Sequence, residues 1–157
     1  MSYSEPFLRE AIRLSKEKME SGEGGPFGAV IVKSGEIIGR GWNRVTSAND
    51  PTAHAEVEAI RNACSALDTF SLEGCEIYAS CEPCPMCLSA IYWARLDALY
   101  FAASRTDAAE AGFDDALLYT EVSKDWDIRT LNSEQHLQDA AQQVFSLWNK
   151  KSDKTPY

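Results

Sequence analysis

The sequence predicts an α/β protein, with a single three-layer α/β/α domain built around a mixed five-stranded sheet. Segments with the apolar pattern of strands alternate with segments of helical period, which is typical of this class. The 157 residues can bury one full core, and no repeat, low-complexity segment or linker divides residues 1–157. With 45% hydrophobic and 25% charged residues, the composition is that of an ordinary globular protein.

The first third of the chain predicts a helix followed by a β-hairpin. The helix spans residues 6–20, where apolar side chains recur at helical spacing, and a glycine-rich stretch ends it. Residues 27–33 and 36–43 are predicted strands, and Ser34-Gly35 is a tight turn between them.

The middle third predicts two helices that alternate with two strands. A favourable helix start at Asp50-Pro51 opens a helix that continues to Leu67. Its expected buried stripe consists of apolar residues at helical spacing, namely Val57, Ile60, Cys64 and Leu67. A strand at residues 75–80, a helix at 83–96 and a strand at 98–103 follow.

The last third of the chain is less regular. One helical turn is expected at residues 107–111 and an apolar segment at 116–119, with a loop between them. Residues 128–132 predict an edge strand, the fifth of the sheet, and Ser133 is the expected cap of a final helix. Residues 150–157 form a tail without a pattern.

The charge balance favours a small-molecule substrate. With 15 basic and 24 acidic residues the net charge is −9. Proteins that act on nucleic acid normally carry a basic surface that neutralises phosphates, so a nucleic-acid partner is not expected. A membrane partner is not expected either, because the longest aliphatic run, Ala29 to Val32, is far too short to span a bilayer.

The cysteines favour a metal site in a reducing compartment. There are five, an odd number, and three of them lie within seven residues. A secreted disulfide framework would spread them along the chain. The amino terminus lacks the pattern of a signal peptide, so a cytoplasmic location is expected.

The stretch with the clearest chemistry runs from Cys81 to Cys87 and is considered together with His54-Ala55-Glu56. Thiolates three residues apart in a first helical turn point the same way, with Cβ atoms about 5–6 Å apart. The positive end of the helix dipole also favours deprotonated sulfur. The pattern H-x-E followed by P-C-x-x-C is the signature of zinc-dependent base deaminases.

Two ligand sets fit this pattern. His54, Cys81, Cys84 and Cys87 together would close a structural Cys₃His site with no open position. Cys81, however, is expected at the end of a strand and not on the helix. This favours His54, Cys84 and Cys87 as the ligands of one zinc ion per chain, with a fourth position left for water.

The two glutamates after His54 are expected to differ. At about 100° per residue, Glu56 lies near the edge of the expected buried stripe, whereas Glu58 points away from it. Burying an unpaired carboxylate is costly, which favours a chemical role for Glu56 as the proton carrier. Glu58 is expected to be a solvated surface charge.

At these residues the sequence resembles the small bacterial-type guanine deaminases of the cytidine deaminase superfamily. The zinc motif alone is shared with cytosine, cytidine and tRNA adenosine deaminases. The discriminating piece is the Ala-Gly-Phe-Asp-Asp segment at residues 111–115. The matching stretches cover most of residues 6–120 and comprise residues 24–32, 49–56, 80–87 with 90–95, and 106–115.

The resemblance implies a cytidine-deaminase-like fold and zinc-dependent hydrolysis of guanine to xanthine and ammonia. It makes Glu56 the proton shuttle and the trio His54, Cys84 and Cys87 the metal ligands. Asp115 would meet the amino edge of guanine, as both a catalytic and a binding residue, because a carboxylate only accepts hydrogen bonds. The other implied substrate contacts are Phe27, Asn43, Trp93 and Tyr157.

Four of these contacts have a plainer alternative. Asn43 could be a turn residue at the end of its strand, and Trp93 could belong to the core. Asp115 could be a solvated loop charge. Tyr157 could belong to a disordered terminus.

Two other functions remain open. The chain could deaminate another base or amino-heterocycle on the same fold, such as cytosine, adenine in tRNA, or a triazine. It could also be a zinc-stabilised interaction module without turnover, although an inward-facing Glu56 argues against this. The resemblance further implies a homodimer in which the C-terminal segment is exchanged between subunits, so that Tyr157 closes the partner's active site.

Overall fold

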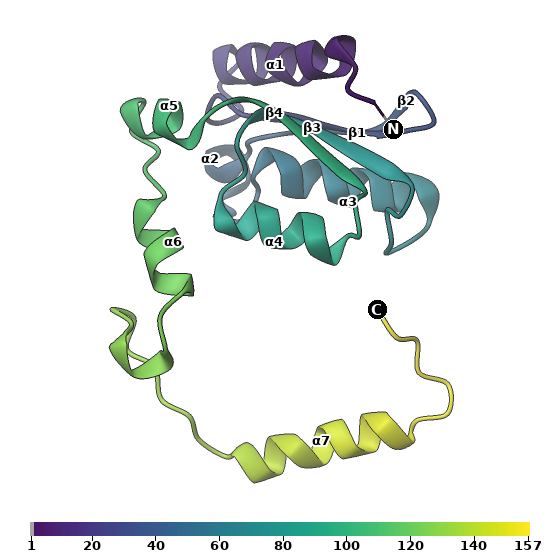
Figure 1. Ribbon diagram of the computed structural model, residues 1–157, viewed down its shortest axis with the longest axis vertical. Coiled ribbons are helices and arrows are strands. Elements are labelled where there is room, and N and C mark those ends of the chain that lie inside the picture. The colour runs from purple at the N-terminus through teal and green to yellow at the C-terminus, as the bar shows by residue number, and fades with distance from the viewer. Residues whose placement is uncertain (1) are drawn as a thin grey trace. The chain divides into compact units, whose positions relative to one another are not determined.

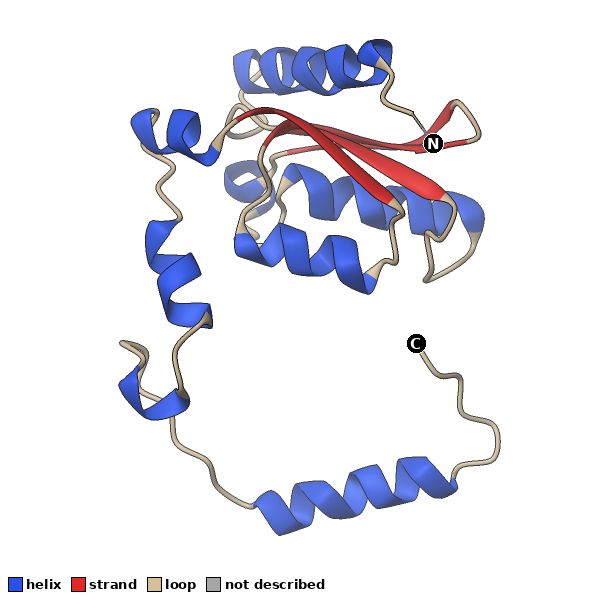
Figure 2. Cartoon of the chain, viewed as in Figure 1, coloured by secondary structure: helices blue, strands red, loops and turns tan. Residues whose placement is uncertain are grey.

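The computed structural model describes residues 2–157, which form two compact units, one up to Tyr119 and one from Thr120 to Tyr157. The elements of both units are shown in Figures 1 and 2. The expected extent of a single domain, residues 1–157, stays a prediction.

The first unit contains a mixed sheet with the strand order β2-β1-β3-β4 (Figure 1). Its strands are β1 (Gly28–Lys33), β2 (Glu36–Trp42), β3 (Cys75–Cys81) and β4 (Ala98–Ala103). β1 pairs antiparallel with β2 and β3, whereas β3 and β4 run parallel. Ser34 and Gly35 both have positive φ, which is the tight hairpin turn that the sequence predicts.

Helices cover both faces of this sheet, which confirms the predicted three-layer class (Figure 2). Helix α1 (Glu5–Glu20) lies on one face, and α3 (Ala55–Leu67) and α4 (Pro85–Trp93) lie on the other. Two short helices complete the unit, namely α2 (Val45–Ala48) and α5 (Arg105–Glu110), and the boundary between the units falls within a third, α6 (Ala116–Val122).

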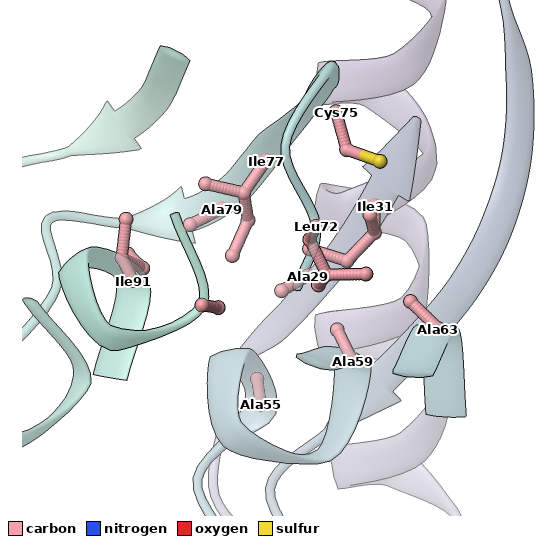
Figure 3. Close-up of a cluster of buried hydrophobic side chains, with 11 residues drawn as sticks. Ala29, Ile31, Ala55, Ala59, Ala63, Leu72, Cys75, Ile77, Ala79 and Ile91 are labelled. Atoms are coloured by element: carbon pink, nitrogen blue, oxygen red, sulfur yellow. The ribbon is translucent and has the colours of Figure 1, made fainter. Parts of the chain in front are cut away.

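The side chains of β1 alternate between two cores. Ala29 and Ile31 point toward α3 and α4, into the larger cluster of Figure 3. Val30 and Val32 point the other way and pack with Leu14 of α1. This alternation is the period of two expected of a strand that is buried on both faces.

Helix α3 approaches β2 so closely that only glycine fits in the strand. A Cβ on Gly41 would lie 2.1 Å from the Ala55 carbonyl oxygen, and one on Gly39 would lie 2.6 Å from that of Ala59. The helix face against the sheet is correspondingly small, formed by Ala55, Ala59 and Ala63 (Figure 3). The expected stripe was therefore misplaced, because Ile60, Cys64 and Leu67 only flank this face and are partly buried.

The start of α3 also differs from the prediction. Asp50 accepts hydrogen bonds from the backbone N–H and the hydroxyl of Thr52, at 2.8 and 2.7 Å. Asp50 thus stabilises a turn and does not cap the helix. The helix begins at Ala55, with His54 as its N-cap.

The second unit contains no strand. Residues Trp126–Ile128 form a short 3₁₀ helix, so the predicted fifth strand at 128–132 is wrong and the sheet has four strands. The last helix, α7, spans Gln138–Lys150 with Leu137 at its N-cap, and the predicted cap at Ser133 is also wrong. Among the described residues, no helix has the length and apolar character needed to cross a membrane.

Candidate metal centre and active site

The N-terminal ends of two helices of the first unit meet at a cluster of titratable side chains. His54 is the N-cap of α3 and Cys84 the N-cap of α4, both in extended backbone conformation. Cys87 lies in the first turn of α4 and is fully buried. Because α3 and α4 cover the same face of the sheet, residues about thirty positions apart come together.

The three predicted ligands form one group. The Sγ atoms of Cys84 and Cys87 lie 3.6 and 3.4 Å from Nδ1 of His54. All three ligand atoms lie within 4.8 Å of one another. Two thiolates and one imidazole are a donor set that suits zinc, and three protein ligands leave a fourth position open.

Cys81 lies outside this group, as the strand-end argument predicts. It is the last residue of β3, and its thiol donates to the Ser104 carbonyl at 3.6 Å. Burial raises the pKa of the Cys81 thiol to about 11, which is unfavourable for a thiolate ligand. The closed Cys₃His alternative therefore has no support in the geometry.

Electrostatics within the trio favour one thiolate even without an ion. The hydrogen bond from Cys87 and the neighbouring His54 ring lower the pKa of Cys84 to about 4. The same hydrogen bond and burial raise the pKa of Cys87, so the proton shared by the two sulfurs stays on Cys87. The pKa of His54 is raised, chiefly by its hydrogen bond with Cys84.

Glu56 faces the cluster, and Glu58 does not. Glu56 lies in the first turn of α3, is only 8% exposed and lines the same pocket as His54 and Cys84. Burial raises its pKa, which suits a group that must accept and release a proton near neutral pH. The side chain of Glu58 is 16% exposed and pairs with Arg61 at 2.8 Å and Arg44 at 3.8 Å. It is therefore an ion-paired residue, not the freely solvated charge expected.

A cavity of about 210 Å³ opens over the cluster. Phe27 and Asn43 line it on the side of the hairpin. Asn43 is 7% exposed, and its Oδ1 accepts hydrogen bonds from the N–H groups of Gly25 and Val45, both at 3.2 Å. Asn43 therefore orders a turn and lines the cavity at the same time.

Asp115 also lines the cavity, from the loop before α6. Burial raises the pKa of its carboxyl, and the positive charge of Arg105 partly offsets this rise. Arg105 also lines the cavity, and its guanidinium lies 4.2 Å from the ring centroid of Tyr119. The cavity thus combines apolar walls with carboxylates and a single arginine among its described lining residues.

Two predicted site residues are not brought to this cavity. Trp93 is 65% exposed and lines a shallow surface hollow with Ser89, Tyr92 and Arg95, so it does not belong to the core. Tyr157 belongs to the second unit and is 74% exposed.

Several lining residues had no substrate-binding role assigned from the sequence. Three of them stood in segments already singled out: Cys81 was weighed as a metal ligand, and Phe113 and Asp114 belong to the segment at 111–115 that carries the resemblance. The others are Glu82, Arg105, Ala108 and Leu118, whose only signal was their position near these segments.

Comparisons with known proteins agree with this geometry. The family model for the cytidine and deoxycytidylate deaminase zinc-binding region matches residues 1–103. The chain is 52% identical to guanine deaminase from Bacillus subtilis (strain 168) over 153 residues, which is 98% of either chain. An X-ray structure of guanine deaminase from Bacillus subtilis superposes with a TM-score of 0.96 at 51% identity, covering 99% of both chains.

Similarity to a tRNA-modifying relative is more limited in extent. The tRNA-specific adenosine deaminase of Aquifex aeolicus (strain VF5) is 50% identical over 99 residues, which is 63% of this chain and 65% of that protein. The region shared with this relative thus leaves more than a third of the chain unmatched, whereas the Bacillus subtilis guanine deaminase matches almost all of it.

Cys84→Ala should abolish stoichiometric zinc binding, because it removes one of three ligands and nothing nearby replaces it. The measurement is zinc per chain by elemental analysis of purified protein, with about one equivalent expected for the unaltered chain. Cys81→Ser is the matched control and should keep its zinc. Loss of zinc in Cys81→Ser, or retention in Cys84→Ala, would contradict the ligand assignment.

Proposed function

Because this chain belongs to the zinc-binding family of cytidine and deoxycytidylate deaminases, we propose that it is a zinc-dependent hydrolase that converts guanine to xanthine and ammonia. The observation that carries the proposal is a buried carboxylate, Glu56, beside a His-Cys-Cys trio in one cavity. The near full-length identity to a guanine deaminase supports guanine as the base.

The proposed metal supplies one element of the chemistry. When bound by His54, Cys84 and Cys87, zinc would provide a water activated at neutral pH. The remaining steps fall to side chains of this chain.

Glu56 is the proposed proton carrier. Its carboxylate takes a proton from the attacking water and delivers it to a ring nitrogen of guanine. The water oxygen then bonds to the neighbouring carbon. Glu56 next moves the remaining proton from the new hydroxyl to the exocyclic amine, so that the carbon–nitrogen bond breaks, ammonia leaves and the carbonyl of xanthine forms. Burial raises the pKa of Glu56, which makes its carboxylate a better proton acceptor than an exposed one.

Asn43, Phe27 and Asp115 are the proposed binding residues. Phe27 offers an aromatic wall on which a purine can pack. Oδ1 of Asn43 is engaged by two backbone N–H groups, so its amide nitrogen is the end left to donate to the base. Asp115 can accept from adjacent donors of guanine, the ring N1–H and the exocyclic amine.

We also propose a homodimer in which Tyr157 of one subunit helps to close the site of the other, with Trp93 near the same interface. Exposed apolar side chains support an unpartnered surface on α7, namely Val144, Phe145 and Leu147. On α4, the side chains of Tyr92 and Trp93 are also largely exposed. The acidic net charge of −9 supports a free base over tRNA as substrate. Five free cysteines support a reducing, cytoplasmic location.

Glu56→Gln should lower turnover by about 10²–10⁴-fold while the zinc content is unchanged, since an amide cannot carry the proton. Initial rates of ammonia release report turnover, and elemental analysis reports zinc. Glu58→Gln is the matched control in the same helical turn and should turn over guanine like the unaltered chain. Equal losses in the two variants would argue against a catalytic role for Glu56.

The unaltered chain should release ammonia from guanine well ahead of adenine and cytosine, and Asp115→Asn should lose most of that activity. The substitution presents donors to the donor edge of guanine, at a cost typical of unpaired buried polar groups, about 1–3 kcal/mol or roughly 10–100-fold in kcat/KM. A substrate panel with each base at equal concentration tests both statements. A preference for adenine or cytosine would overturn the assignment of guanine, and unchanged kinetics in Asp115→Asn would reduce Asp115 to a loop charge.

Removing residues 155–157 should leave a folded, zinc-loaded dimer with at least about tenfold lower kcat/KM, because an open site is less well shielded from water. Light scattering gives the dimer mass, and ammonia release gives the rate. Tyr157→Phe separates the hydroxyl from the ring. A truncated chain that works like the full chain would exclude the tail from the site.

A further inference from the structure

A second cavity lies directly behind one wall of the substrate cavity. It has a volume of about 230 Å³, similar to the 210 Å³ of the first. The two cavities share four lining residues, Phe27, Cys81, Ala108 and Phe113. The second cavity extends from there toward Ile12 of α1 and Ala111 at the end of α5 and has a mostly apolar lining.

Two of the four shared residues are aromatic. The rings of Phe27 and Phe113 meet edge to face, with centroids 4.9 Å apart and an interplanar angle of 88°. Phe27 is anchored by its backbone, whose N–H donates to Gly25 at 2.8 Å and whose carbonyl accepts from Asn43 at 3.1 Å. Its ring packs against the larger core cluster.

Phe113 is the aromatic residue of the shared wall whose side chain can be truncated without disturbing the core. It follows Gly112, which has a φ of +94°, and its N–H donates to the Ala108 carbonyl at 2.9 Å. The backbone thus fixes the position at which the ring joins the wall between the two cavities. The residue is nevertheless 45% exposed and belongs to neither core cluster. Truncating this side chain should open the wall without removing core packing.

We propose that Phe113 is a specificity-determining residue, which closes the purine cavity from the apolar space behind it and restricts the enzyme to bases without a substituent on that side. This inference rests on the proposed action on a free purine base. A bare purine needs no room beyond the wall, whereas an alkyl group directed at Phe113 would have to displace a ring held by Phe27. Overpacking of this kind is costly because it forces side chains away from their preferred rotamers and shifts the backbone.

The test is substrate selectivity in Phe113→Ala. The substrates are guanine and guanines that carry a methyl or ethyl group on N7, C8 or N9, one position at a time. Ammonia release gives kcat/KM for each, and zinc content and melting temperature show that the variant is intact. For the position that faces the wall, kcat/KM relative to guanine should rise at least about tenfold in Phe113→Ala, the usual effect of admitting one carbon to an apolar pocket.

A second substitution tests whether access to the second cavity causes this gain in relative kcat/KM. Ala111 lines only the second cavity, so Ala111→Leu alone should leave guanine turnover unchanged. In the double variant with Phe113→Ala, the added leucine should refill the space and reverse the gain. A gain that persists in the double variant, or no gain at any position in Phe113→Ala, would overturn the proposal.

A failure of the proposed function can be distinguished from a failure of the Phe113 proposal. If the unaltered chain released no ammonia from guanine, the assigned reaction would be wrong. The wall would still be tested by titration calorimetry of the zinc-loaded proteins with alkylated xanthines, which needs no turnover. Tighter relative binding of one alkylated series to Phe113→Ala supports the wall, and identical relative affinities refute it.

Discussion

The close contact between α3 and β2 is the constraint on which the site depends. Without side chains at Gly39 and Gly41, the helix can lie directly on the strand, with alanines as its only buried side chains at the contact. The first turn of this helix carries His54 and Glu56. Any larger residue in the strand would move the helix outward and carry both groups with it, since a Cβ at Gly41 would meet the helix backbone at 2.1 Å. Core packing and site geometry are therefore set by the same contact.

Two helix N-termini then meet at the metal ligands. His54 caps α3 and Cys84 caps α4, so both positive helix ends face the two sulfurs. Each helix also leaves unsatisfied N–H groups at this end, which favours negative charge there. This explains why a thiolate is tolerated at half-buried Cys84 and why the acidic Glu56 can sit beside it. The fold supplies the electrostatic field, and the motif supplies the ligands.

The zinc ligands could be predicted from sequence because they are encoded by short spacing: Cys84 and Cys87 share one helical turn, and Cys81 falls on the strand before it. The buried face of α3 could not be predicted in this way. Its residues are small because glycines on a separate strand let the helix approach closely, whereas the periodicity argument considers only large apolar residues within the helix itself. The prediction of a fifth strand was wrong for a related reason. Residues 128–132 have strand-like composition, but a strand needs a neighbour, and local pattern does not reveal whether one exists. Phe113 stands in the segment at residues 111–115 that carries the resemblance, but its own role could not be predicted, because the sequence does not reveal the cavity behind it.

Two hydrogen bonds fix the orientation of the Asn43 side-chain amide in the cavity. Since Gly25 and Val45 both donate to Oδ1, the amide cannot rotate by 180° without setting its NH₂ group against two N–H groups. The amide nitrogen of Asn43 is thus the end that can donate into the cavity, while the carboxylate of Asp115, which also lines it, can only accept hydrogen bonds when ionised. In the proposed binding mode, a planar ligand with both kinds of group on its rim would satisfy both residues in one of its two flipped orientations. The turn that holds Asn43 would in this way select which face of a flat molecule is turned toward Phe27.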